Sequence, residues 1–133
     1  MYGYESVSIN SGTTAGGAGV STNNNTSSHV VVGQICSIGV TYNGSPPATT
    51  DLVVATAGNN GPALTILTLT NATTDGWFHP RHKLDDESAA DITYDGTNEV
   101  YDKVCVADNI KITVSQADDG DSVDVVVVYY AGR

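Results

Sequence analysis

Large aromatic side chains and positive charges are both scarce in this chain. Of its 133 residues, one is tryptophan (Trp77), one is phenylalanine (Phe78) and five are Lys or Arg. The formal net charge is −10 and the isoelectric point is about 4.2. Because such a domain repels phosphate backbones and anionic lipids, we expect neither direct nucleic-acid binding nor binding to a membrane surface.

Charge is almost absent from the first half of the chain. Residues 1–74 contain only Glu5 and Asp51, whereas the other 13 acidic residues and all 5 basic ones follow. Apolar residues make up 40% of the chain, and its 14 glycines come with many Thr, Asn and Ser residues. This composition and length are typical of one turn-rich β domain.

Long apolar runs and a secretory signal are also missing. No run approaches the roughly 20 residues of a membrane helix, and Met1–Glu5 lacks the basic start of a signal peptide. We therefore expect synthesis in a cytoplasm, which keeps thiols reduced. This favours two buried thiols at Cys36 and Cys105, with one disulfide between them as the alternative.

Alternation of apolar and polar residues predicts about eight strands after an N-terminal arm, and no helix. Four consecutive valines, Val125–Val128, predict a central strand covered on both faces. The pattern favours an all-β fold, an antiparallel β-sandwich of the jelly-roll kind. The clearest expected strands span residues 29–41, 51–57, 64–70, 91–94, 99–106, 110–115 and 122–130.

Residues 1–27 are expected to form a separate arm, a short strand followed by a flexible connector, with the sandwich in residues 28–133. The connector is rich in Gly, Thr, Ser and Asn. Tyr2, Tyr4, Val7 and Ile9 make the strand too apolar for an ordinary tail, so we predict that they bind a partner. The alternative is a disordered terminus.

Trp77 and Phe78 are the predicted anchors of the core. They follow the strand-like run Leu64–Thr70. Aromatic side chains bury more area per residue than any others, and these two are the only tryptophan and the only phenylalanine of the chain.

The sequence around the histidines gives little support for a metal site or a catalytic site. His79 and His82 could hold a transition metal with Asp85 and Asp86, but Pro80 argues against the helix that would bring them to one face. No histidine lies in a nucleophile-elbow motif. A hydrogen-bonded surface loop is the favoured interpretation.

The acidic residues offer two further candidates. Asp118, Asp119 and Asp121 could wrap a Ca²⁺ ion, yet they lack EF-hand spacing, and a solvated hairpin turn is favoured. The run 85–87 could supply paired glycosidase carboxylates, but few aromatics are available to stack on a sugar. We expect no enzyme, no cofactor and no metal.

Three segments carry a resemblance to a known family. They are Gly76–Arg81 (GWFHPR), Asp91–Tyr101 (DITYDGTNEVY) and Ile110–Val114 (IKITV), the last followed by the valine-rich strand. Together they resemble the head decoration, or cement, proteins of tailed bacteriophages, over roughly residues 64–130.

This resemblance implies a non-enzymatic virion protein on the capsid exterior, made in the host cytoplasm. It implies that the protein binds the major capsid protein between capsomers, stabilises the shell and is a homo-oligomer, with a trimer favoured. Two alternatives stay open. One is a tail or fibre-associated receptor-binding domain, and the other is a carbohydrate-binding β-sandwich module, which should show a planar strip of aromatics.

Overall fold

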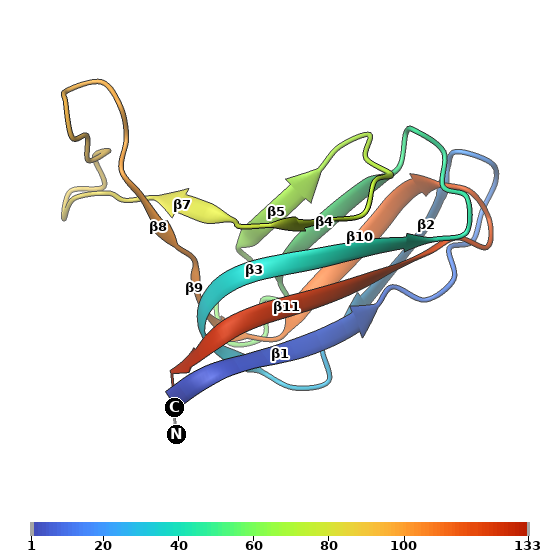
Figure 1. The fold of residues 1–133 in the computed structure, drawn as a ribbon, viewed down its shortest axis with the longest axis horizontal. Coiled ribbons are helices and arrows are strands. Elements are labelled where there is room, and N and C mark those ends of the chain that lie inside the picture. Colours follow the sequence, from blue (N-terminus) through green and yellow to red (C-terminus); the bar gives the residue numbers. More distant parts are fainter. Residues whose placement is uncertain (1, 133) are drawn as a thin grey trace.

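A computed structural model describes residues 2–132, except for the side chain of Tyr2. Every regular element in that range is a strand, and all paired strands are antiparallel (Figure 1), which confirms the predicted all-β antiparallel sandwich. The strands are β1 (Tyr2–Asn10), β2 (Ser21–Thr26), β3 (Val31–Asn43), β4 (Asp51–Thr56), β5 (Thr65–Leu69), β6 (Gly76–Phe78), β7 (Arg81–Lys83), β8 (Tyr101–Lys103), β9 (Cys105–Asp108), β10 (Ile110–Ala117) and β11 (Ser122–Gly132).

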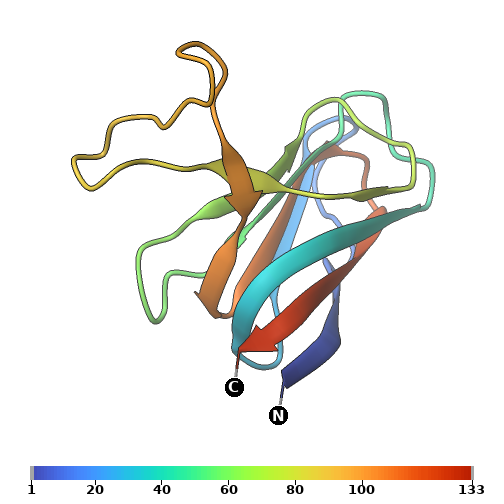
Figure 2. The ribbon, with the colours of Figure 1, turned by 60° about the vertical axis from the view of Figure 1, so that its left-hand side comes forward.

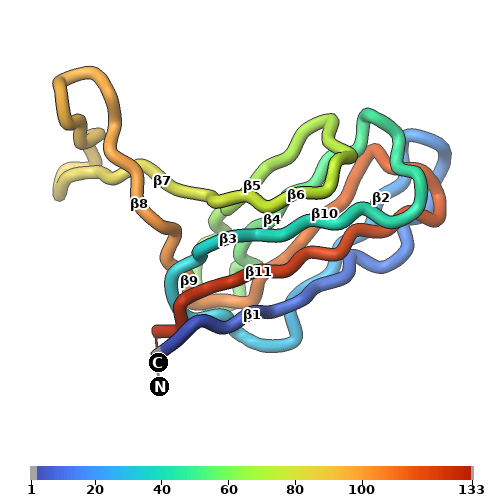
Figure 3. Tube along the Cα trace, in the orientation of Figure 1, coloured from blue at the N-terminus to red at the C-terminus, as the bar shows by residue number. Residues whose placement is uncertain are grey.

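Two sheets face each other. The first has the order β1-β11-β3-β6, with β9 also paired to β3, and the second has the order β2-β10-β4-β5. Figure 3 shows how the chain passes repeatedly from one sheet to the other, as it does from β1 to β2 and from β2 to β3. A third, two-stranded ribbon, β7-β8, stands apart from both.

The core lies between the two sheets and is built by strict alternation along the strands. In β11 the inward-facing Val123, Val125 and Val127 are fully buried. In β10 the same holds for Ile110, Ile112 and Val114. β-branched side chains pack well on a pleated surface, so a core rich in Val and Ile matches the strand geometry.

A bulge in β3 allows two apolar residues at odd spacing to face the core. Ile35 and Ile38 are both fully buried although alternation would put them on opposite faces. The register explains this, because Ile35 pairs with Tyr129 and Ser37 with Val128, so that Cys36 is left without a partner. One extra residue on β3 therefore reverses its alternation.

The expected N-terminal arm is wrong, because residues 2–27 belong to the sandwich. β1 pairs with β11 along its whole length, from Tyr2 to Asn10, and β2 pairs with β10. Val7 and Ile9 are only 5% and 3% exposed and join the core. The apolar residues that suggested a partner-binding tail are those that dock the strand on its own sheet.

The connector between β1 and β2 is not the free linker that its composition predicted. The Thr14 amide donates to Asp121 O at 2.7 Å, and the Thr14 hydroxyl donates to Asp118 O at 2.6 Å. The Gly19 amide donates to Asp118 Oδ1 at 2.7 Å. Side-chain and backbone hydrogen bonds thus hold a Gly-rich segment against the β10–β11 turn.

The last strand is central, as predicted, but only one of its faces is covered. β11 lies between β1 and β3, while Val126 and Val128 on its outer face are half-buried. The prediction that both faces are covered is therefore wrong for the described residues. An apolar strand with an open face leaves hydrophobic area for contact with another molecule.

We predict that Ile9→Ala lowers the free energy of unfolding by about 2–5 kcal/mol, because it opens a cavity under β1. Tyr4→Ala, on the exposed face of the same strand, should lower it by less than about 1 kcal/mol. Urea unfolding of the two variants and the wild type measures this difference. Equal midpoints for Ile9→Ala and the wild type would show that β1 does not contribute to the stable core.

Candidate functional site

An aromatic and apolar strip crosses the outer face of the five-stranded sheet. Pairing across the sheet sets Val126 beside Gly39 and Gly39 beside Trp77, while Tyr4 lies opposite Tyr130. Alternation along β11 puts Val126, Val128 and Tyr130 on one face. We call this surface the outer strip, and it consists of Tyr4, Trp77, Val126, Val128 and Tyr130.

Trp77 is not a core anchor, which corrects the prediction made from its size. Its side chain is 61% exposed, whereas the adjacent Phe78 is half-buried and packs against the core. Both residues lie in β6, and successive side chains in a strand point to opposite faces. Only one member of the pair could fill the core, and Phe78 takes that position.

The indole of Trp77 lies directly on the backbone of β3. A Cβ atom added at Gly39 would come within 2.9 Å of the indole carbons, so only glycine leaves room for the ring. Gly39 also belongs to a strand that is paired on both sides, which makes this support rigid. The rest of the indole remains exposed as a flat apolar surface.

A shallow hollow with a polar rim adjoins Trp77. It has a volume of about 260 Å³, and its lining includes Gly39, Thr41, Asp75 and Val126. Asp75 is held in place because its Oδ1 accepts a hydrogen bond from the Tyr42 amide at 2.8 Å. The hollow can take a small apolar group with a polar atom directed at the rim.

Two hydrogen bonds hold the side chain of Asp124, which lies at one end of the outer strip. The Asp124 carboxylate accepts from Asn10 Nδ2 at 2.6 Å and from Asn43 Nδ2 at 2.7 Å, linking three neighbouring strands. These two bonds, that from Asn10 first, favour the charged form and hold the pKa of Asp124 below its ordinary value of 3.8.

A second exposed surface is the hairpin formed by residues 81–103, which projects from the sandwich (Figures 1 and 2). Its outer part is closed by a ring of backbone hydrogen bonds: Leu84 N to Val100 O at 2.9 Å, Ile92 N to Leu84 O at 3.0 Å, and Val100 N to Ile92 O at 3.0 Å. Three segments spaced eight residues apart thus support one another.

An ion-pair cluster beside this ring repeats the same spacing. Lys83 Nζ lies 3.1 Å from Asp91 Oδ2 and 3.5 Å from Glu99 Oε1. The hydrogen bond and charge of Asp91, then the charge of Glu99, raise the pKa of Lys83 above its ordinary value. The cluster is exposed, so its main effect is on the hairpin's geometry rather than on stability.

The hairpin presents aromatic side chains from a preformed tip. Asp95 Oδ1 accepts from the amides of Asn98 at 2.6 Å and Thr97 at 2.9 Å, and these bonds, those from Asn98 first, hold the pKa of Asp95 below its ordinary value. Tyr94, directly before this turn, is 73% exposed, and Tyr101 is exposed as well. An ordered tip costs little conformational entropy when it binds.

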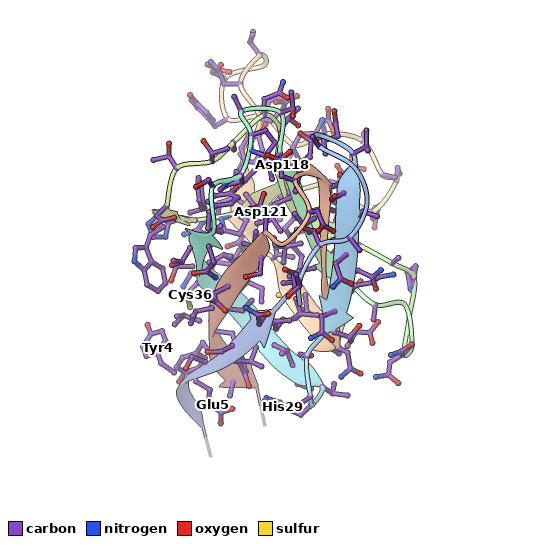
Figure 4. All side chains as sticks on the ribbon, turned by 90° about the vertical axis from the view of Figure 1, so that its right-hand side faces the viewer. Tyr4, Glu5, His29, Cys36, Asp118 and Asp121 are labelled. Carbon is purple, nitrogen blue, oxygen red and sulfur yellow. The ribbon has the colours of Figure 1, made fainter. Side chains whose placement is uncertain are left out.

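The acidic turn is used for structure. The carboxylate of the buried Asp121 accepts from the amides of Ser45 and Asp118, and Asp118 itself accepts from Gly19. Figure 4 shows Asp118 and Asp121 together at one end of the sandwich, with His29 at the other. Within residues 2–132, no three His, Cys, Asp or Glu side chains are placed to hold a metal ion.

The remaining predicted residues separate into exposed and buried ones. Tyr4 is 72% exposed and meets Tyr130 edge to face with ring centroids 5.3 Å apart. Val7 is buried like Ile9, so neither forms part of an interface, and the side chain of Tyr2 lies outside the described residues.

The cysteines also differ from expectation. Cys36 is half-buried, Cys105 is exposed, and both are free. The prediction of two buried thiols is therefore wrong, because Cys36 is only partly buried and Cys105 lies in an edge strand with its side chain turned outward.

Sequence reasoning missed the hairpin tip. Residues 91–94 and 99–106 were expected to form two ordinary strands. The available signal was the eight-residue spacing of Leu84, Ile92 and Val100, together with Lys83, Asp91 and Glu99 one position earlier.

Comparisons with known proteins identify no family. No family model matches the chain, and no curated protein matches it by sequence. Its fold is similar to a crystal structure of FLHE, with 14% identity, 96% of each chain covered and a TM-score of 0.45. It is also similar to a crystal structure of the SPBc2 prophage-derived protein YomS, with 12% identity, 94% of each chain covered and a TM-score of 0.41. Neither similarity assigns a function.

Among the described residues there is no helix long and apolar enough to span a bilayer.

We predict that Trp77→Ala lowers the free energy of unfolding by less than about 1 kcal/mol, because the side chain is mostly exposed. Phe78→Ala should destabilise the domain more, since Phe78 contacts the core. Chemical denaturation compares the two variants. As Trp77 is the only tryptophan, acrylamide should quench the fluorescence of the folded protein strongly. Weak quenching would place the indole in the interior.

The lowered pKa of Asp124 predicts a pH effect with a definite sign. The stability contributed by Asp124 is fully present above its unfolded-state pKa of about 3.8 and is lost as the pH falls from there through the lower folded-state pKa. Asp124→Asn should therefore flatten the acid limb of the stability profile. A profile that keeps the wild-type slope would mean that the two asparagine bonds do not form in solution.

Proposed function

We propose that the protein is a non-enzymatic virion structural protein that binds the outer surface of an assembled phage capsid and stabilises it. The observation that carries this proposal is the outer strip, in which Trp77 lies exposed on a rigid, paired sheet. Contiguous exposed apolar surface on a stable domain marks a protein–protein contact. Aromatic side chains are the residues most enriched at the centres of such contacts.

The positions of the segments that resemble decoration proteins support the same proposal. Gly76–Arg81 contains Trp77, and Asp91–Tyr101 makes the tip of the hairpin. Most side chains of both segments are exposed. Core packing therefore does not account for this part of the resemblance to decoration proteins, whereas a shared binding surface does.

The charge of the hairpin indicates what its partner surface should carry. Residues 81–103 contain seven acidic residues and three basic ones. A basic patch on the major capsid protein, beside an apolar groove for Tyr94, would complement this element. Each single contact with the capsid can be weak, because a symmetric shell presents many equivalent sites and several are bound at once.

The test is co-sedimentation of the purified protein with expanded capsids of the phage that encodes it. Trp77→Ala and Tyr94→Ala should each weaken binding at least tenfold, whereas Val20→Ala, at an exposed apolar residue of the β1–β2 connector, should not. Added salt should weaken binding through the acidic hairpin. Capsids that bind none of the proteins, wild type included, would refute the proposal.

A second candidate is a tail or fibre-associated receptor-binding domain, or a carbohydrate-binding module. Tyr4, Tyr130 and Trp77 lie on one sheet face, the aromatic strip that sugar binding requires. Copy number distinguishes these roles. Quantitative mass spectrometry of virions should find hundreds of copies of a decoration protein, whereas a dozen or fewer copies, with glycan binding lost in Trp77→Ala, would favour the tail.

A further inference from the structure

The outer edge of β1 offers a row of unpaired backbone groups. Just beyond the end of β1, the Ser11 amide donates to Val123 O at 2.9 Å, so Ser11 and Val123 form a hydrogen-bonded pair. Ile9 and Val125 are the pair two residues away in the same register. In an antiparallel pair, hydrogen-bonded residues alternate with those that point away. The odd residues of β1 therefore bond to β11, and the even ones direct their N–H and C=O groups outward.

This edge lacks the usual protection against pairing. Within residues 2–132 no strand pairs with the outer side of β1. β1 is nine residues long and contains no proline, no lysine and no bulge. Its only charge is Glu5, whose carboxylate accepts from the Tyr129 hydroxyl at 2.8 Å. Long, flat, uncharged edges add strands from other chains unless something covers them.

We propose that a second copy of this chain covers the edge, with the two β1 strands antiparallel about a two-fold axis at Ser6. The proposal goes beyond the capsid-binding function and does not depend on it, and it replaces the trimer that the family resemblance implies with a dimer. A two-fold contact lets one strand serve as its own partner, because the same row of N–H and C=O groups faces itself in reverse. The five-stranded sheet would continue from one copy into the next.

Charge and the length of the paired strand select this register. A two-fold axis at Glu5 would oppose two carboxylates in a non-hydrogen-bonded pair, where side chains come closest. An axis at Val7 would pair only residues 4–10 of the two strands, whereas the axis at Ser6, the midpoint of residues 2–10, pairs the whole strand. The axis at Ser6 therefore gives the longest ladder and keeps the two Glu5 side chains apart.

Side-chain sizes match across the same register. With Ser6 opposite Ser6 of the second copy, Tyr4 lies opposite Ser8, so a large side chain meets a small one. Ser8 is the register neighbour of Val126. The exposed ring of Tyr4 would therefore reach the outer strip of the second copy, joining the two strips into one surface.

The first experiment measures molar mass in solution by light scattering and sedimentation. The wild type and Ser6→Ala should be dimers. Ser6→Pro should be a monomer, because proline removes an outward N–H that β11 does not use. Circular dichroism checks that Ser6→Pro folds. Should it not fold, Ser6→Lys provides the test, because it sets two lysines opposite each other at the axis and should give a folded monomer.

The second experiment tests the register by cross-linking in a Cys36→Ser, Cys105→Ser background. Ser6→Cys should form a disulfide-linked dimer on mild oxidation, because Cα atoms of a hydrogen-bonded antiparallel pair are about 5.5 Å apart, within the disulfide range. Ser8→Cys should not, since its two copies would be roughly 13 Å apart. A monomeric wild type, a trimeric mass, or equal cross-linking at both positions would overturn the proposal.

Discussion

The pairing of β11 with both β1 and β3 is the interaction on which the rest of the structure depends. It joins the last strand to the first over residues 2–10 and to the longest strand over residues 33–43. The inner side of this three-stranded unit supplies much of the core through Val125, Val127 and Tyr129. Its outer side carries the outer strip. One ladder thus determines both what holds the domain together and what it shows to a partner.

The two exposed surfaces differ in how their geometry is maintained. The outer strip is rigid because Trp77 rests on Gly39 in a strand paired on both sides. The hairpin has no sheet beneath it, so it relies on its own ring of backbone hydrogen bonds and on Lys83. The domain therefore offers one flat surface and one projecting element for contact with other molecules.

Local pattern was a good guide where one face of a strand is buried. The alternation of Ile110, Ile112 and Val114 correctly predicted a half-buried strand, and the turn at Asp118–Asp121 was correctly placed. The local pattern gave wrong predictions where two structural rules applied to the same residues. The size of Trp77 suggested burial, yet its neighbour Phe78 already occupied the inward position. The glycine-rich composition of residues 11–20 suggested a free linker, but Thr14 and Gly19 find partners that lie about a hundred residues away in sequence.

The fold class could be predicted from the amino-acid sequence alone, because the spacing of β-branched and turn residues is a local property that favours strands over helices. The composition also shows that the chain is acidic, with a formal net charge of −10. The folded structure was needed to show which strands are neighbours, that β1 is an edge strand and that Trp77 faces outward. These facts depend on pairing between residues far apart in the chain, and strand pairing leaves no trace in the local pattern, because any apolar strand can in principle pair with any other.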